Sequence, residues 1–217
     1  GIGSLLLNKV EERAHVLVKG KLGVQTLMNQ IPFTNTAARN LGEKRGYQFS
    51  RLYERMKIEL KSPPNDPNLP EGMTLRPFQP NHDEETLFSI YDETFQDAWG
   101  YTKKDGSTWI SQKKANGYDP SLWFIAWKHS KPVGFLMGRM LDDEVFIDLS
   151  GVKREYRKHG LGKALLLHAF GLAYERKQKT ILLYVDSDSL TNANRLYQQV
   201  GMSPHSQTTV YSKQLTI

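Results

Sequence analysis

A basic segment near residue 160 has the composition of a phosphate-binding loop. It reads VKREYRKHGLGKALL from Val152, and its glycines and basic side chains are Arg157, Lys158, Gly160, Gly162 and Lys163. Glycines let backbone N–H groups approach an anion, and the free N–H groups and dipole of a helix start attract negative charge. The pattern predicts a loop and helix N-terminus that hold a pyrophosphate. The alternative is a basic turn followed by a glycine-capped helix.

The flanking residues predict a mixed α/β domain. Three runs rich in aliphatic and aromatic residues precede the loop, with turn residues between them, and should form an antiparallel meander. Apolar residues recur at helical spacing after the loop. The predicted strands are 74–78, 122–127, 133–140, 144–152, 181–186 and 208–215, and the predicted helices are 83–95, 109–114, 161–178 and one ending near 200. We expect an α/β (α+β) fold with a mixed, mostly antiparallel sheet flanked by helices.

A proline-rich stretch divides the chain. Residues 61–73, KSPPNDPNLPEGM, carry four prolines and almost no periodicity, which predicts an extended, exposed connector. We expect three segments: a partial domain over 1–60, the linker over 61–73 and a complete domain over 74–217.

The segment before the linker repeats part of the second domain. GIGSLLLNKVEERA at Gly1 parallels GLGKALLLHAFGLA at Gly160, and Ala38-Arg-Asn-Leu parallels Ala193-Asn-Arg-Leu. Self-similarity of this kind predicts a tandem duplication. The first copy has no counterpart of residues 74–159, and the sequence does not begin with Met. We therefore expect the C-terminal half of a second domain, in a truncated or proteolysed product of a longer protein.

Composition excludes several other classes of protein. The chain has 217 residues, 39% of them hydrophobic, enough for one full core and part of a second. The absence of cysteine excludes disulfides and thiolate metal sites, and we expect no metal. No apolar run is long enough for a membrane span and no signal peptide begins the sequence, so we expect a cytoplasmic protein without a membrane partner.

The positive charge of the chain raises a nucleic-acid alternative. The formal net charge is +6 and the pI about 9.3. The basic residues are scattered along the sequence and form no aromatic-interleaved stripe, so we expect no nucleic-acid partner. A polyanionic cofactor explains a modest positive excess equally well.

Two motifs in this order resemble the GNAT superfamily of N-acetyltransferases. The first is Arg157, two residues, Gly160, one residue and Gly162; the second is Leu196-Tyr197, three residues and Gly201. The resemblance covers residues 74–215 and includes the element order. The tandem plan is similar to a mycothiol-synthase-type architecture. The resemblance implies the GNAT fold and direct transfer of an acetyl group from acetyl-CoA to a primary amine of a small molecule.

The resemblance also assigns roles to residues of this chain. Tyr197 occupies the family's general-acid position, and a backbone N–H at or next to Val152 would stabilise the oxyanion. Phe146 occupies the position at which the family often has a carboxylate, so Asp148, acting through water, is the candidate base. The predicted catalytic residues are Tyr197 and Asp148, and the predicted cofactor-binding residues are Gly151, Val152, Arg157, Lys158, His159, Gly160, Leu161, Gly162, Lys163, Asn192 and Asn194.

Two alternatives from other classes remain open at this point. A catalytically weak acyl-CoA sensor or scaffold would have Tyr197 in the core or a blocked acceptor cleft. A basic nucleic-acid-binding module would gather Lys and Arg on one face away from Gly160. The sequence indicates neither the acceptor amine nor the oligomeric state.

Overall fold

The computed structural model describes residues 1–115, 117–189 and 193–215. Within them the chain forms two compact units. The first unit contains Gly1–Arg55, Val185–Asp188 and Pro204–Ile217, and the second contains Met56–Tyr184 and Ser189–Ser203. No helix of the described residues is long and apolar enough to cross a membrane.

The second unit is built on a mixed sheet. Its strand order is β7-β6-β5-β4-β3, with the end of β2 beyond β7. Neighbours from β3 to β6 pair antiparallel, and β6 and β7 pair parallel. The strands are β2 Gln48–Glu59, β3 Met73–Pro77, β4 Tyr118–Lys128, β5 Lys131–Leu141, β6 Glu144–Val152 and β7 Thr180–Asp186. The meander predicted from the three apolar runs is confirmed, and β6 has the predicted bounds.

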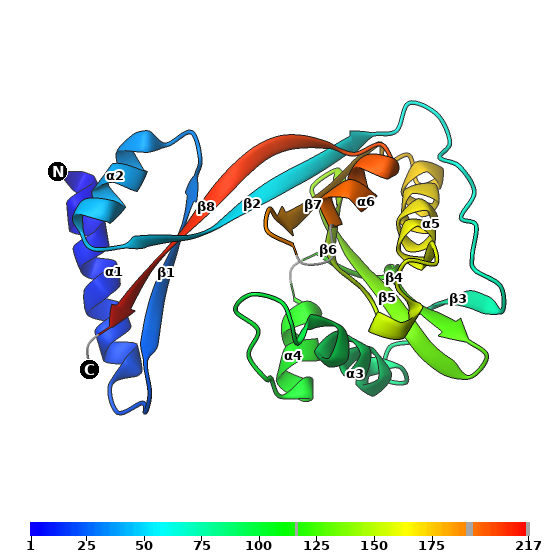
Figure 1. The fold of residues 1–217 in the computed structure, drawn as a ribbon, viewed down its shortest axis with the longest axis horizontal. Helices are drawn as coiled ribbons and strands as arrows, with labels where there is room; N and C mark the ends of the chain where they lie inside the picture. The colour runs from blue at the N-terminus through cyan, green and yellow to red at the C-terminus, as the bar shows by residue number, and fades with distance from the viewer. Residues whose placement is uncertain (116, 190–192, 216–217) are drawn as a thin grey trace. The chain divides into compact units, whose positions relative to one another are not determined.

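Helices cover both faces of this sheet (Figure 1). On one face, a Cβ added to Gly151 of β6 would meet Thr94 of α3. On the other, a Cβ added to Gly134 of β5 would meet Leu161 of α5. The helices are α3 Glu84–Phe95, α4 Gly106–Lys113, α5 Leu161–Glu175 and α6 Ala193–Gln199, with a 3₁₀ helix at Arg154–Tyr156. The sheet is therefore the middle layer between α3 and α5.

Local hydrogen bonds explain where two helices depart from their predicted bounds. Helix α4 begins at Gly106 because the Asp105 side chain accepts from the Thr108 N–H at 2.8 Å and caps the helix. Helix α5 stops at Glu175 and does not reach residue 178. Lys177 has a φ of +64 just beyond the helix. The Gln178 N–H donates to the Ala173 carbonyl, and this bond ends the helix.

The first half of the sequence has the same order of elements as the end of the second half. The early elements are α1 Ile2–Val18, β1 Gln25–Pro32, α2 Thr36–Lys44 and β2, and the corresponding later elements are α5, β7, α6 and β8 Ser203–Leu215. Strand order in the first unit is β1-β8-β2. The order of elements agrees with the similarity between the two sequence segments.

The final strands are exchanged between the two halves of the sequence. Strand β8 ends the second half, yet it pairs antiparallel with β1, from Gln25 opposite Leu215 to Pro32 opposite Thr208. Strand β2 ends the first half, yet it neighbours β7. Just beyond β2, the Leu60 N–H donates to the Lys179 carbonyl at 2.8 Å. Each unit is thus completed by a strand from the other half of the sequence.

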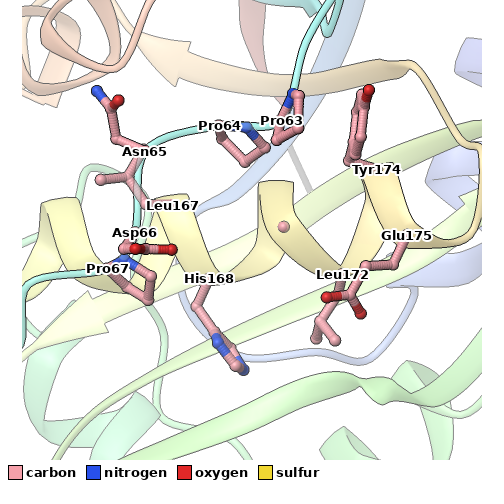
Figure 2. A pocket seen from close by; sticks show the side chains of 11 residues that line it. Pro63, Pro64, Asn65, Asp66, Pro67, Leu167, His168, Leu172, Tyr174 and Glu175 are labelled. Atoms are coloured by element: carbon pink, nitrogen blue, oxygen red, sulfur yellow. The ribbon is translucent and has the colours of Figure 1, made fainter.

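The proline-rich linker follows the surface of the second unit. Residues 61–72 form no helix or strand. Figure 2 shows Pro63, Pro64 and Pro67 beside α5, near Leu167 and Tyr174. A shallow groove of about 230 Å³ lies between linker and helix. The prolines keep this crossing extended, because their fixed φ favours an extended chain.

Candidate active site

The two central parallel strands separate at the middle of the second unit. Strands β6 and β7 pair at only three positions, the last being Ile147 opposite Leu183. Beyond Ile147, β6 continues to Val152 along β5 alone. Within the part of the chain that the structure describes, the last five residues of β6 therefore have one edge without a strand partner.

Backbone groups of Val152 point toward this open edge. The next residue, Lys153, donates its N–H to Val133 on the β5 side at 2.9 Å. Since successive residues of a strand point their N–H and C=O groups to alternate edges, the Val152 groups point away from β5. The role of a backbone N–H at or next to Val152 as oxyanion donor stays a prediction, and the orientation of Val152 is compatible with it.

A β-bulge places Asp148 at the point where the strands part. Met137 of β5 lies opposite Leu149 and Gly138 lies opposite Ile147, so Asp148 is the extra residue on β6. Its carboxylate forms an ion pair with Arg139, with 3.0 Å from Oδ1 to Nε. The Arg139 guanidinium also lies 4.9 Å over the Phe146 ring. Asp148 and Phe146 thus share the α3 and α4 face of the sheet.

Arg157 fixes the basic loop to the end of β6. Its Nε donates to the Val152 carbonyl at 2.8 Å and its Nη2 to the Thr94 carbonyl at 3.4 Å. The guanidinium thus donates to two backbone carbonyls, one on β6 and one on α3. Arg157 is therefore a positioning residue for the loop in this structure, rather than a side chain that reaches freely into solvent.

The loop itself presents backbone groups to solvent. Lys158 has φ +65 and Gly160 has φ +89, and a Cβ at Gly160 would meet no atom within 4 Å. Left-handed residues in such a turn direct successive N–H groups toward one point, which favours an anion. Helix α5 begins at once after Gly160 and has no side-chain cap. Its first-turn N–H groups are therefore available to an anion.

The other predicted loop residues divide into exposed and buried ones. His159 and Lys163 are exposed, whereas Leu161 is buried in the core. Gly162 packs closely on α6, since a Cβ there would meet Leu196 Cδ2 at 3.1 Å. Gly151 likewise allows close packing, because a Cβ there would meet Thr94. Neither glycine is required by a positive φ.

Helix α6 carries Tyr197 beside this glycine contact. The Tyr197 side chain is half-buried, and burial raises its pKa to about 12. A phenol with that pKa stays protonated at neutral pH. On the same helix, Asn194 Oδ1 is buried without a donor among the residues that the structure describes. Asn192 lies outside the described residues.

The segment between α3 and α4 borders the face on which Asp148 lies. Tyr101 donates its hydroxyl to Asp92 Oδ1 at 2.5 Å, a bond that raises the pKa of Tyr101 to about 12. Trp109 of α4 is buried and stacks on Tyr91 at 4.5 Å between ring centroids. Lys113, one turn further along α4, is half-buried and interacts electrostatically with Asp148.

His168, on α5, belongs to the core rather than to the site. Its ring lies 4.9 Å from Phe124 in an edge-on arrangement, and burial lowers its pKa. His168 also lines the groove beside the linker prolines (Figure 2). Among the described residues no group of three or more His, Asp or Glu is placed to hold a metal ion.

Comparison with known proteins assigns the family. The model of the acetyltransferase (GNAT) family matches residues 84–202. The chain belongs to the GNAT acetyltransferase family. This GNAT chain is 31% identical over 217 aligned residues to a mycothiol acetyltransferase of Thermobispora bispora, covering 94% of the chain and 68% of the relative. It is 29% identical to a mycothiol acetyltransferase of Streptomyces griseus, covering 79% of the chain and 56% of that relative.

Solved structures place the GNAT chain in the same fold. A GCN5-related N-acetyltransferase from Sphaerobacter thermophilus matches with a TM-score of 0.86 and 31% identity, covering 99% of this chain and 68% of that one. A tandem GNAT protein from the clavulanic acid biosynthesis pathway matches with a TM-score of 0.68 and 12% identity, covering 94% and 68%. The second likeness concerns the fold alone. The chain is thus an acyltransferase with the GNAT fold.

Two residues that interact with Asp148 were not predicted as site residues from the sequence. Arg139 lies on β5 and Lys113 on α4, and neither belongs to a recognisable motif. The hairpin pairing of β5 with β6 could have indicated Arg139, because cross-strand neighbours lie about 5 Å apart. Lys113 had no such local signal, since its position depends on how α4 packs on the sheet.

Proposed function

We propose that this chain transfers an acetyl group from acetyl-CoA to the primary amine of a small molecule by direct attack. The observation that carries the proposal is the open edge of β6, which leads from the bulge at Asp148 to the anion-binding loop at Lys158–Lys163. Acetyl-CoA would supply the thioester carbonyl as the electrophile. The relatives named above, both mycothiol acetyltransferases, support acetyl transfer in this family.

The residues present fit the cofactor. The backbone N–H groups of the left-handed loop and of the first turn of α5 would bind the pyrophosphate. Lys158 and Lys163 are exposed around them and add positive charge, and His159 is exposed beside them. Asn194 offers a buried oxygen that has no donor among the described residues, which suits an N–H group of the pantetheine arm.

Tyr197 is the proposed general acid. The C–S bond breaks as the amine nitrogen bonds to the carbonyl carbon, and the phenol donates its proton to the sulfur. Because burial holds the pKa of Tyr197 near 12, the proton is present on the phenol at neutral pH. The Val152 N–H, on the open edge of β6, is the proposed donor to the oxyanion.

Asp148 is the proposed route for the amine proton. An ammonium has no lone pair, so it must lose a proton before attack. The Asp148 carboxylate lies where the open edge begins, and we propose that it accepts this proton through water. The ion pair with Arg139 fixes its orientation.

The experiment follows thiol release from acetyl-CoA in the presence of a panel of small primary amines. Tyr197→Phe should lower kcat by about 10² to 10⁴, the usual contribution of a general acid. Tyr174→Phe, on the surface of α5, is the matched control and should leave kcat unchanged. Acetyl-CoA binding without turnover would overturn the proposal in favour of a sensor. Turnover with kcat unaffected by Tyr197→Phe would overturn the role of Tyr197.

A further inference from the structure

Tyr184 is exposed in a unit whose other large apolar side chains are covered. It lies on β7, an inner strand of the sheet with β6 on one side and β2 on the other. The residue is 48% exposed. Among the described residues of the second unit, it is the single large hydrophobic residue that is exposed to solvent. Its ring is therefore accessible to a ligand on a strand that otherwise packs into the core.

Tyr184 lies where β6 and β7 separate. The last pair of these strands is Ile147 with Leu183, and the next residues are Asp148 on β6 and Tyr184 on β7. Paired strands lie about 4.8 Å apart, so these two residues occupy neighbouring positions at the start of the opening. Under the proposed function, Asp148 receives the proton of the acceptor amine there. Tyr184 therefore borders the place where the amine reacts.

Tyr184 also ends a row of side chains on one face of the sheet. Phe146 on β6 lies opposite Arg139 on β5, and the Arg139 guanidinium is 4.9 Å from the Phe146 ring centroid. On the β7 side, the Phe146 and Tyr184 ring centroids are 5.7 Å apart. Arg139 Nε in turn lies 3.0 Å from the Asp148 carboxylate. The row thus crosses three neighbouring strands and joins Tyr184 to Asp148 through direct contacts.

The β7 end of this row is its accessible part. Phe146 is buried, and the Arg139 guanidinium already interacts with both Phe146 and Asp148. Phe146 supports the Tyr184 ring from one side, with 56° between the two ring planes. Among the described residues the Tyr184 hydroxyl has no hydrogen-bond partner. The feature that Tyr184 offers a ligand is therefore a supported aromatic ring rather than a fixed polar group.

We propose that Tyr184 is a specificity-determining residue, and that the acceptor is a primary amine with an apolar ring beside its amino group. The inference rests on the proposed function and names its substrate class. Apolar surface that leaves water on binding stabilises a complex, and an aromatic ring packs well against a second ring in an offset or edge-on arrangement. The ring of the acceptor would pack on Tyr184, and its amino group would lie toward Asp148.

The test compares amines that differ by one ring. Phenethylamine carries a phenyl ring that ethylamine lacks, and cyclohexylmethylamine carries a cyclohexyl ring that methylamine lacks. We expect the wild type to favour the ring-bearing member of at least one pair by about tenfold or more in kcat/KM. Tyr184→Ala should reduce that ratio to about twofold, mainly through KM, because the apolar contact is lost. Tyr184→Phe keeps the ring and should retain most of the ratio.

Phe49→Ala is the matched control, since it removes another exposed aromatic ring that packs beside a second one. Phe49 is 57% exposed, and its ring centroid lies 6.1 Å from that of Tyr211 within the first unit. The substitution should leave the ratio unchanged, and melting temperatures would show that each variant folds.

Three kinetic outcomes would overturn the inference. One is equal kcat/KM for both members of each pair in the wild type, and another is a preference for the ring that survives Tyr184→Ala. The third is loss of the preference in Tyr184→Phe, which would assign the effect to the hydroxyl instead of the ring.

A binding measurement separates this inference from the proposed function. Calorimetric titration of phenethylamine or ethylamine into the protein with CoA reports acceptor affinity without turnover. Tighter binding of phenethylamine, lost in Tyr184→Ala, supports the inference even if no acetyl group is transferred, in which case the proposed function fails. Turnover of both amines with equal affinities leaves the function and overturns the inference.

Discussion

Arg157 donates its Nε–H to the carbonyl oxygen of Val152, and this 2.8 Å bond connects the two parts of the proposed site. The loop that would bind pyrophosphate and the strand end that would bind the oxyanion are fixed to one another by a single side chain. The second bond of Arg157, to the Thr94 carbonyl, adds α3 to the same connection.

Arg157→Lys tests whether geometry or charge is the contribution of this residue. Lysine keeps the charge but cannot donate to both carbonyls, so we expect unfolding free energy to fall by about 1–2 kcal/mol. The KM for acetyl-CoA should rise about tenfold as the loop loses its position. Lys163→Ala, at an exposed position, should weaken acetyl-CoA binding in a salt-dependent way with little change in stability. Equal stability of Arg157→Lys and wild type would contradict the positioning role.

Gly160→Ala tests the left-handed turn at the start of α5. At φ +89 an alanine is strained, and we expect a loss of about 1 kcal/mol together with weaker acetyl-CoA binding. Gly171→Ala is the matched control on the same helix. A Cβ there meets nothing within 4 Å, so helix propensity should raise stability by about 0.5–1 kcal/mol. Urea denaturation and calorimetry check both, and equal effects of the two substitutions would contradict this account.

Gly151→Ala tests the close approach of α3 to β6. The added Cβ would lie 2.6 Å from Thr94 Oγ1 and 2.7 Å from Phe135 Cε1, so overpacking should cost about 1–3 kcal/mol. Thr94→Ala removes the first of these contacts. The double variant should therefore recover part of the loss, with a coupling of about 1 kcal/mol in a double-mutant cycle. Strict additivity of the two substitutions would show that the contact is relieved elsewhere.

The local part of this structure could be predicted from sequence. Strand β6 and the start of α5 at Leu161 follow from apolar runs and glycine placement, which act over a few residues. No local sequence feature indicates the bulge at Asp148, because the bulge depends on how β5 and β6 pair. The electrostatic interaction of Lys113 with Asp148 depends on the tertiary structure and has no local signal in the sequence. The role of Arg157 was predicted as charge, and the structure shows two backbone hydrogen bonds.

The exchange of strands β2 and β8 between the two halves could not be predicted from the sequence either. Pairing of β8 with β1 joins residues that are nearly the whole chain apart, Gln25 with Leu215. No local feature of the β1 sequence indicates which strand lies beside it. The similarity of the two sequence segments predicted a partial second domain over residues 1–60, and only the structure shows which strand completes which unit.

Met56→Ala tests the contribution of the first half of the sequence to the second unit. Met56 lies on β2, and its side chain is fully buried at 0% exposure although it precedes the linker. Truncation of a buried methionine leaves a cavity, so we expect a loss of about 2–5 kcal/mol. Met28→Ala, on β1 at 49% exposure, should cost well under 1 kcal/mol. A small effect of Met56→Ala in urea denaturation would contradict the place of β2 in the core of that unit.

The pH dependence of Tyr197 gives a signature that a packing role alone would not produce. With the pKa raised to about 12 from 10, the folded state holds this proton more tightly than the unfolded state. Stability from this group is therefore complete below pH 10 and is lost as pH rises toward 12. The acid form also persists there, so Tyr197 should cause no fall in kcat between pH 7 and 10. Tyr197→Phe should reduce the alkaline loss of stability by the share of this group, since Tyr47 and Tyr101 titrate in the same range, and should lower kcat throughout that range. A basic limb in the wild-type kcat profile near pH 8 that disappears in Tyr197→Phe would contradict the raised pKa, whereas an unchanged alkaline transition would place the titrating group elsewhere.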